Sequence, residues 1–522
     1  MPDTRFPSAT AIVHSIRSGA RSARDILEAH IHRIESVNPQ LNALVMPRFE
    51  EARREADAAD AVQRRGDPLG ALHGVPVTIK DQFDVAGLPT TLGLSRLRDR
   101  VATRDGSMVA ALRRAGAIVL GKTNVPQTLA TIETDNRIWG RTHNPWDLAR
   151  TAGGSSGGEA ALIAAGGSPL GLGGDFGGSL RIPAAYCGLC TIRPTARRLP
   201  PGDRFPVRTA EGAEVIVAQP GPLARQVDDL TLALRVMVDH GVAHPSVHQV
   251  PVPFADPADV DLRRLRVALL PQVSDWVPSP AIRRALRESA DALRAAGTSV
   301  VEWTGAPDTT DGVLLFFRIM AATGFASLAQ TLSGEAPIDL VEPNLQLARL
   351  PNALLPVLGR LLKSRGAGRL SRMLQAASKQ SAAGYLDLAG DRLAYEQRMR
   401  DALEAGGFDA ILLPASPLPA VRHGDTRGLA DFWGSCLLFN VLGWPAGVVP
   451  VTRVRPGEES DRPDSRERTE QLARVVERGS AGLPIGVQIA APPWREDRVL
   501  ALMRAIEQHA RCQPDFPADP PV

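Results

Sequence analysis

Two glycine-rich loops, each containing serine, are the part of this sequence best suited to chemistry. The first loop, GGSSGG, covers residues 153–158, and the second loop, GGDFGGS, covers residues 173–179. Glycine adopts turns that other residues avoid and lets backbone amides approach a ligand closely. Successive N–H groups in such loops can hold a phosphate or the oxyanion of an acyl-transfer intermediate. The loops therefore predict an anion-binding site, with serine hydroxyls beside it.

The known phosphate-binding patterns do not fit these loops. A P-loop needs a lysine directly after its last glycine, and no lysine follows either loop. The dinucleotide pattern G-x-G-x-x-G fails because Phe176 stands at its last position. The nucleophile elbow G-x-S-x-G matches with Ser155 or Ser156 at its centre, but it requires a preceding strand. Residues 147–152 are polar and turn-like, so we expect no strand there and treat the match as accidental.

The loops resemble the diagnostic stretch of the amidase signature family, in which GGSSGG, a helix and G-T-D-x-G-G-S-x-R-x-P follow one another. Here residues 153–183 read GGSSGGEAALIAAGGSPLGLGGDFGGSLRIP, and residues 74–81, GVPVTIKD, match the family's lysine motif. The resemblance runs from about residue 8 to beyond residue 503. It implies an α/β fold: a single large α/β/α unit with a mixed central sheet covered by helices on both faces.

The resemblance also implies a catalytic set, a Ser-Ser-Lys triad without metal or cofactor. Ser179 matches the nucleophile, Ser155 the bridging serine that typically follows a cis peptide bond, and Lys80 the general base. The backbone N–H groups that match the oxyanion hole are those of Phe176, Gly177, Gly178 and Ser179. Physically, an alcohol needs a base to become a nucleophile, and lysine is a base only when neutral. Burial must therefore bring the lysine pKa from ~10.4 to about 7–8, with carboxylates kept away from its nitrogen.

Neighbouring residues have expected structural roles. We expect Ser156, Asp175 and Arg181 to brace the loops. Gly174 stands where the family usually has threonine, so a hydroxyl near the nucleophile is missing and the loop is expected to be more flexible.

Several stretches resemble the fatty acid amide hydrolases within this family. They are GKTNVPQ at 121–127, FNVLGWPAGVVPV at 439–451 and GLPIGVQ at 482–488. By the same resemblance, Leu129 would offer a backbone carbonyl near the leaving amine.

Residues 343–386, here called the basic hairpin, contain no Asp or Glu and seven Lys or Arg residues. Their apolar residues follow helical spacing, which predicts a pair of amphipathic helices. Pattern alone slightly favours packing on the protein core, whereas the resemblance favours a membrane-binding cap near the mouth of an acyl channel. The predicted lipid-facing residues are Leu354, Leu355, Leu358, Leu361, Leu362, Arg360 and Lys363.

Composition excludes several classes of protein. The 522 residues hold 60 Lys and Arg against 57 Asp and Glu, a near balance that argues against a nucleic-acid binder. Four cysteines form no disulfide framework, and the Cys187–Cys190 C-x-x-C pair is interpreted as small buried residues. The best membrane-span candidate, residues 312–332, is interrupted by Arg318, so a buried helix is expected. The N-terminus does not resemble a signal peptide. We expect a cytoplasmic protein, with peripheral membrane attachment open.

The predicted organisation is an N-terminal helical segment (1–65) packed on a catalytic domain (66–515), with a charged surface excursion at 454–482. Ser22 is expected to cap a helix that ends before Pro39. Strands are expected at 75–80, 117–120, 267–270, 299–302, 408–413, 447–451 and 485–489, in alternation with helices.

The sequence therefore predicts a serine hydrolase that cleaves hydrophobic, long-chain N-acyl amides, with esters as further substrates, through an acyl-enzyme. One alternative is a broad-specificity or aryl-acylamide amidase acting on short or aromatic acyl groups. A remote alternative is the glutamine amidotransferase subunit of tRNA-linked transamidation. The simplest alternative is a non-catalytic lipid-binding protein. The expected partner is a small-molecule amide, with no nucleic acid, and a homodimer fits the family.

Overall fold

The computed structural model describes residues 6–200, 215–241 and 250–522. Its centre is a mixed sheet of eleven strands in the order β1-β3-β2-β6-β8-β7-β12-β13-β11-β9-β10. These strands are β1 (Leu44–Pro47), β2 (Pro76–Lys80), β3 (Ile118–Thr123), β6 (Leu170–Asp175), β7 (Cys190–Arg193), β8 (Gln219–Ala224), β9 (Arg266–Leu269), β10 (Ser299–Glu302), β11 (Ala410–Pro414), β12 (Ala446–Arg453) and β13 (Pro484–Ala490). Strands β3, β2 and β6 run parallel, as do β10, β9 and β11, and antiparallel pairs connect these two groups.

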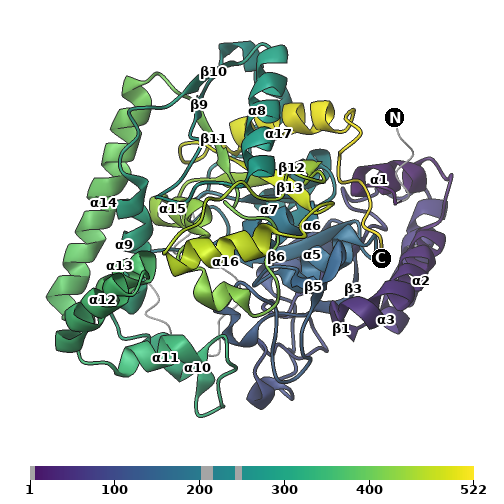
Figure 1. Ribbon diagram of the computed structural model, residues 1–522. Helices are drawn as coiled ribbons and strands as arrows, with labels where there is room; N and C mark the ends of the chain where they lie inside the picture. The colour runs from purple at the N-terminus through teal and green to yellow at the C-terminus, as the bar shows by residue number, and fades with distance from the viewer. Residues whose placement is uncertain (1–5, 201–214, 242–249) are drawn as a thin grey trace.

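Helices cover both faces of this sheet (Figure 1). On one face α7, α8 and α17 pack against β8, β11 and β12, and on the other α5 and α6 pack against β6, β12 and β13. The helices are α1 (Ala9–Arg17), α2 (Ala23–Leu41), α3 (Phe49–Arg64), α4 (Ser107–Arg114), α5 (Gly157–Ala164), α6 (Arg181–Cys187), α7 (Val227–Gly241), α8 (Pro280–Ala295), α9 (Thr309–Ala321), α10 (Ala326–Leu332), α11 (Glu342–Arg349), α12 (Leu355–Ser364), α13 (Gly368–Ala376), α14 (Ala382–Ala405), α15 (Gly434–Leu442), α16 (Arg468–Glu477) and α17 (Glu496–Ala510). The predicted α/β/α architecture is confirmed.

The central strands are buried on both faces, and this explains their composition. Every residue of β2, β3, β6, β11 and β13 is buried. Strands covered on both faces have near-continuous apolar runs in place of alternation, as in AILLP of β11. Polar side chains within such strands, notably Thr78 and Lys80, therefore require partners inside the protein.

Two local predictions are wrong. Helix α2, capped by the Ser22 side chain as expected, continues through Pro39 to Leu41. The continuation buries Leu41 and ends at Asn42, which adopts a left-handed conformation and bonds its N–H to the Asn38 carbonyl. Residues Asp147–Thr151 form β5, which pairs with β4 (His143–Asn144) in a separate two-stranded sheet. A strand therefore does precede the first loop.

The segment between β10 and β11 folds into helices α9–α14, which extend along one side of the molecule (Figure 1). Among the described residues, no single helix is long and apolar enough to cross a membrane. Helices α9 and α10 meet those criteria only as a pair, and they are bent by 53° relative to each other. The single buried helix expected at 312–332 is therefore wrong in part, because the chain breaks after α9 and only Leu332 of α10 is buried. Helices α12 and α13 pack against each other.

The charged segment at 454–482 connects β12 to β13 and contains α16. Its charges do not all face solvent. Arg462 bonds the buried carboxylate of Glu477 at 2.8 Å and Glu470 at 2.6 Å. Arg369 of α13 reaches the same Glu470 and also bonds Asp275 at 3.1 Å. These ion pairs fasten α13 to the body of the protein.

Candidate active site

Lys80, the last residue of β2, lies inside the protein and reaches the first loop. Its side chain is fully buried, and its Nζ donates to the Ser155 Oγ at 2.8 Å and to the Gly174 carbonyl at 3.1 Å. The structure thus brings Lys80 and Ser155 into direct contact, although 75 residues separate them in the chain. The first loop and the end of β6 meet at this amine.

The surroundings of Lys80 favour the neutral amine. Burial lowers the pKa of Lys80 from 10.5 to about 7, while the more distant Asp175 and Glu159 act in the opposite direction. Among the described residues, no carboxylate oxygen lies within 4.0 Å of its nitrogen, in contrast to Lys122, which bonds Asp81 at 2.7 Å. Because the partners of Lys80 are a hydroxyl and a carbonyl, a neutral amine remains available as a proton acceptor near pH 7.

The first loop is packed so tightly that its glycines have no room for side chains. A Cβ atom on Gly158 would lie 2.5 Å from the Asn124 nitrogen, and one on Gly154 would lie 2.6 Å from the Thr131 carbonyl. The peptide bond between Gly154 and Ser155 is cis. The backbone N–H of Ser156 donates to the Ser179 carbonyl at 3.2 Å. This contact holds the two loops side by side.

Asp175 organises the second loop from within. Its buried carboxylate accepts bonds from the backbone N–H groups of Gly178 (2.8 Å) and Leu180 (3.2 Å) and from Arg181 (3.0 Å). Burial would raise the pKa of Asp175, but the guanidinium of Arg181 and its other donors hold that pKa well below its usual range. The contacts match the bracing role expected for Asp175 and Arg181.

Arg181 also links the second loop to residues that are distant in the chain. Its guanidinium donates to the Asn440 side chain at 2.7 Å and the Gln488 side chain at 2.9 Å, and Asn440 in turn donates to Asp175 at 2.9 Å. These partners lie more than 250 residues away from Arg181 in the chain. The second loop is therefore fixed by α15 and β13.

The four backbone amides predicted for an oxyanion hole differ in availability. The N–H of Gly178 is already bonded to Asp175, so the inclusion of Gly178 in that set is not supported by the structure. The N–H groups of Phe176, Gly177 and Ser179 have no acceptor among the described residues. These three remain as candidate oxyanion donors.

Ser179 is partly exposed, unlike Lys80 and Ser155. Its hydroxyl has no hydrogen-bond partner among the described residues, so no hydrogen bond joins Ser179 to Ser155 here, and the bridging role of Ser155 stays a proposal. A partly exposed hydroxyl beside three free amides is accessible to a substrate.

Sequence reasoning missed a polar cluster beneath Lys80. The buried carboxyl of Glu159 on α5 accepts from Thr78 at 2.6 Å and Thr123 at 2.8 Å. Burial raises the pKa of Glu159 to about 8, so it is largely neutral at pH 7. Residues i and i+2 of a strand share a face, so Thr78 could have been expected beside Lys80. Nothing in the sequence connects Glu159 to them.

The Asp81–Lys122 ion pair was also missed. Both side chains are fully buried, and Lys122 also donates to Thr90 at 2.8 Å, while Asp81 accepts from the backbone N–H of Thr91 at 3.1 Å. The pair holds Asp81, the neighbour of Lys80, against β3 and against the loop at 90–91. Lys122 lies in the GKTNVPQ stretch, which was the available signal.

Leu129 lies in a strained turn. Both Thr128 and Leu129 have positive φ angles, 63° and 60°, a conformation that costs about 1–3 kcal/mol per residue. The Leu129 side chain packs against a small apolar cluster that includes Leu92 and Leu94. Its proposed contact with a leaving amine stays a prediction.

The basic hairpin is oriented by its packing, and one predicted lipid-facing residue is wrong. Leu355 is buried, at 3% exposure, so it is not available to lipid. Leu358 and Leu362 are half-buried, whereas Leu354, Leu361, Arg360 and Lys363 are exposed. Val357, not in the predicted set, is the most exposed large hydrophobic residue of α12, at 58%.

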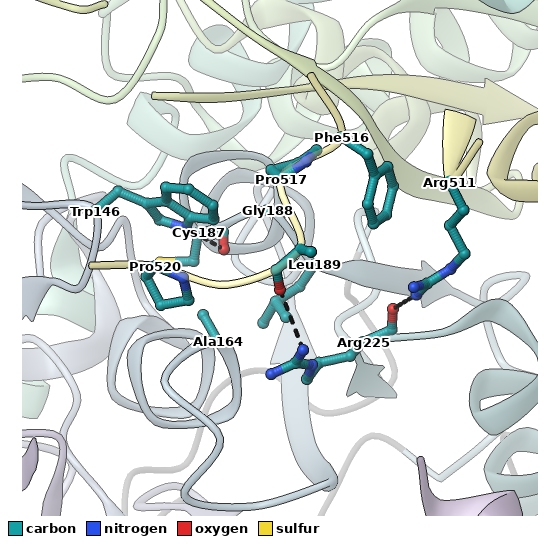
Figure 2. Close-up of a pocket in the computed structure, with 11 residues that line it drawn as sticks. Trp146, Ala164, Cys187, Gly188, Leu189, Arg225, Arg511, Phe516, Pro517 and Pro520 are labelled. Atoms are coloured by element: carbon teal, nitrogen blue, oxygen red, sulfur yellow. Dashed lines mark hydrogen bonds between the residues drawn. The ribbon is translucent and has the colours of Figure 1, made fainter. Parts of the chain in front are cut away.

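A separate cavity near the C-terminal segment contains none of the predicted catalytic residues (Figure 2). Trp146, Cys187, Arg225 and Phe516 are among its lining residues, and Arg225 donates to the Ala518 carbonyl at 3.1 Å. Its volume of about 10 Å³ is no larger than one water molecule needs. It is a packing gap and not a substrate site.

The described residues contain no group of three or more His, Cys, Asp or Glu side chains that could hold a metal ion. Cys187 and Cys190 are free and buried, and burial raises the pKa of both thiols. A buried thiol with a raised pKa is unreactive, as expected for small core residues.

Comparisons with known proteins identify the family of this chain. A protein-family model described as Amidase matches residues 25–500. Fatty-acid amide hydrolase 1 of Sus scrofa is 33% identical over 504 residues, which cover 95% of this chain and 84% of that protein. Indoleacetamide hydrolase of Bradyrhizobium diazoefficiens is 34% identical over 516 residues, which cover 96% of this chain and 86% of that protein.

The fold comparison gives the same result. A solved structure of fatty acid amide hydrolase superimposes with a TM-score of 0.81 at 26% identity, covering 97% of this chain and 85% of that one. The family match spans most of the chain and includes both loops and the lysine motif. This chain therefore belongs to the amidase signature family of amide C–N hydrolases.

Proposed function

We propose that this enzyme hydrolyses hydrophobic N-acyl amides through a Ser179-Ser155-Lys80 triad. The observation that carries the proposal is the 2.8 Å hydrogen bond from a fully buried lysine to a serine hydroxyl. A buried lysine normally needs a carboxylate partner, as Lys122 has in Asp81. Lys80 has only neutral partners, which suits a base and does not suit a structural ion pair.

In the proposed mechanism, the Ser179 Oγ attacks the carbonyl carbon of the substrate amide. Its proton passes through the Ser155 hydroxyl to neutral Lys80. The negative charge that develops on the carbonyl oxygen is stabilised by the free N–H groups of Phe176, Gly177 and Ser179, and each such donor contributes roughly 3–4 kcal/mol.

When the tetrahedral intermediate collapses, the C–N bond breaks and the proton returns from Lys80 through Ser155 to the leaving amine. The acyl group stays on Ser179. A water molecule then attacks this ester, with the same residues moving its proton, and releases the acid. Every proton is accounted for by the triad, so this route needs no further group.

A hydrophobic acyl group is supported by the aromatic residues beside the second loop. The Phe176 ring lies 5.9 Å from Phe316 of α9, which lies 5.8 Å from Phe317, and Phe317 lies 6.0 Å from Trp433. Phe176, Phe317 and Trp433 are only half-buried. Rings of this kind next to the nucleophile favour apolar acyl groups over polar ones.

The test is a series of N-acyl amides from acetyl to oleoyl, with aryl-acyl members, measured as kcat/KM with Ser179→Ala as the blank. Rates that rise with chain length support the long-chain proposal. A maximum at short or aromatic acyl groups instead supports the aryl-acylamide alternative, which leaves the triad intact. Hydrolysis that survives in Ser179→Ala refutes the nucleophile assignment.

We further propose that α12 attaches the enzyme peripherally to anionic membranes. Leu354, Val357 and Leu361 are 47%, 58% and 44% exposed, and Arg360 and Lys363 are exposed beside them. Exposed apolar side chains next to cations are typical of interfacial helices.

Co-sedimentation with phosphatidylserine vesicles tests this attachment. Val357→Asp should release the enzyme from the vesicles, whereas Val101→Asp, at a site 52% exposed outside the basic hairpin, should not. Equal binding of both variants would contradict the proposal. The glutamine amidotransferase alternative would instead require glutaminase activity and co-purifying subunits.

A further inference from the structure

The side chain of Gln82 lies against Gly174, the position where the second loop departs from the family pattern. A Cβ atom added to Gly174 would lie 2.9 Å from both the Nε2 and the Oε1 of Gln82, closer than real Cβ contacts. Gln82 therefore fills the volume that a side chain at position 174 would need. The two residues are matched to each other.

Gln82 is also next to the proposed base. Its backbone N–H donates to the Lys80 carbonyl at 2.6 Å, in the turn that directly follows β2. The Lys80 Nζ donates to the Gly174 carbonyl at 3.1 Å. The lysine amine and the Gln82 carboxamide thus border the same residue. In the proposed mechanism, Lys80 is the group that returns the proton to the leaving amine through Ser155.

The Gln82 carboxamide has unused hydrogen-bonding capacity. The side chain is half-buried, and neither of its polar atoms has a hydrogen-bond partner among the described residues. A carboxamide offers two donors and a carbonyl acceptor. The neighbouring polar side chains Lys80, Asp81 and Ser155 are all bonded to other groups.

We propose that Gln82 is a specificity-determining residue whose side-chain carbonyl accepts the N–H of the scissile amide. The proposal rests on the proposed function of Ser179 and Lys80. An ester of the same acyl group has no N–H and would leave this acceptor unpaired, so the site favours amides that carry an N–H. A site built to bond a substrate donor discriminates against analogues that lack it.

The experiment compares a secondary amide and its matched ester, with the same acyl and leaving groups, in the full-length enzyme. Gln82→Met keeps the length of the side chain and removes its polar atoms. The ratio of amide to ester kcat/KM should fall about tenfold, the factor expected for one hydrogen bond. Gln346→Met, on the exposed surface of α11, is the matched control and should leave the ratio unchanged.

A second pair of variants tests the contact with Gly174. Gly174→Ala displaces the carboxamide and should lower the same ratio, whereas in a Gln82→Ala background it should have little additional effect. A ratio that stays constant in Gln82→Met, or equal losses on amide and ester, would overturn the proposal. If Ser179→Ala hydrolyses the ester as fast as the wild type, the proposed function fails instead, so the two failures are distinguishable.

Discussion

Protonation of Lys80 should switch off amide hydrolysis as the pH falls through 7. Burial lowers the pKa of this lysine to about 7, so about one tenth of the enzyme has a neutral lysine at pH 6 and about one hundredth at pH 5. We expect kcat/KM to fall tenfold per pH unit below 7, because only the neutral amine accepts the Ser179 proton. The assay is kcat/KM between pH 5 and 9 on an amide that does not titrate, with recovery at pH 8 as the control for acid unfolding.

The same pKa has a consequence for stability. Between pH 7 and 10.5 the unfolded chain carries a proton on Lys80 that the folded chain lacks, so the free energy of unfolding rises with pH by about 1.4 kcal/mol per unit. Over the whole window this amounts to about 5 kcal/mol. Lys80→Met removes the titrating group, so the variant should lack this slope and be more stable than the wild type at pH 7.

Urea unfolding of both proteins at pH 7.5 and 9.5 measures the effect. The stability gap between Lys80→Met and the wild type should narrow by about 3 kcal/mol between these two pH values. A constant gap, together with a kcat/KM profile that stays flat to pH 5, would refute the assignment of Lys80 as a buried neutral base.

Three further predictions concern the structure around the site. Asp175→Asn leaves the buried Arg181 without its carboxylate and should reduce stability by about 3–5 kcal/mol in urea unfolding; a loss under 1 kcal/mol would contradict the bracing role. Gly158→Ala places a methyl group 2.5 Å from the Asn124 nitrogen and should lower the free energy of unfolding by about 1–3 kcal/mol. The control is Gly390→Ala in α14, where nothing lies within 4 Å, and it should raise the free energy of unfolding by up to about 1 kcal/mol. Equal urea midpoints for the two variants would be evidence against tight packing of the first loop. Burial raises the pKa of Asp229 to about 6, so its contribution to stability falls as the pH rises from about 4 to 6; Asp229→Asn should not show this fall in thermal unfolding, and parallel curves for the two proteins would refute it.

Local signals in the sequence were sufficient wherever a short segment decides its own structure. Ser22 caps α2 because its side chain satisfies a free N–H at the start of the helix. The β-rich run at 75–80 predicted β2, and the strands and helices in alternation predicted a covered mixed sheet. The same local reasoning failed at Pro39 and at 147–151, where burial of Leu41 and pairing with β4 outweigh the propensity of the segment.

The loops and the lysine were found from the sequence because the turns and the charge-bearing residue are encoded in contiguous motifs. The motifs also gave the three residues of the proposed triad and the bracing roles of Asp175 and Arg181. The motifs did not predict the burial and the hydrogen-bond partners of these side chains. That Lys80 bonds Ser155 and no carboxylate is decided by the parallel pairing of β2 with β3 and β6.

Only the tertiary structure decided which of several equivalent groups is available. Gly178 and Gly177 look alike in sequence, yet the first donates its N–H to Asp175 and the second has no acceptor among the described residues. Leu354 and Leu355 are adjacent leucines, and one is exposed while the other is buried. In the sequence, Gly174 is only a missing side chain, whereas in the structure the Gln82 side chain occupies the space that a side chain at position 174 would need. The physical reason is common to all three: partners distant in the chain determine burial and hydrogen bonding, and no local pattern records them.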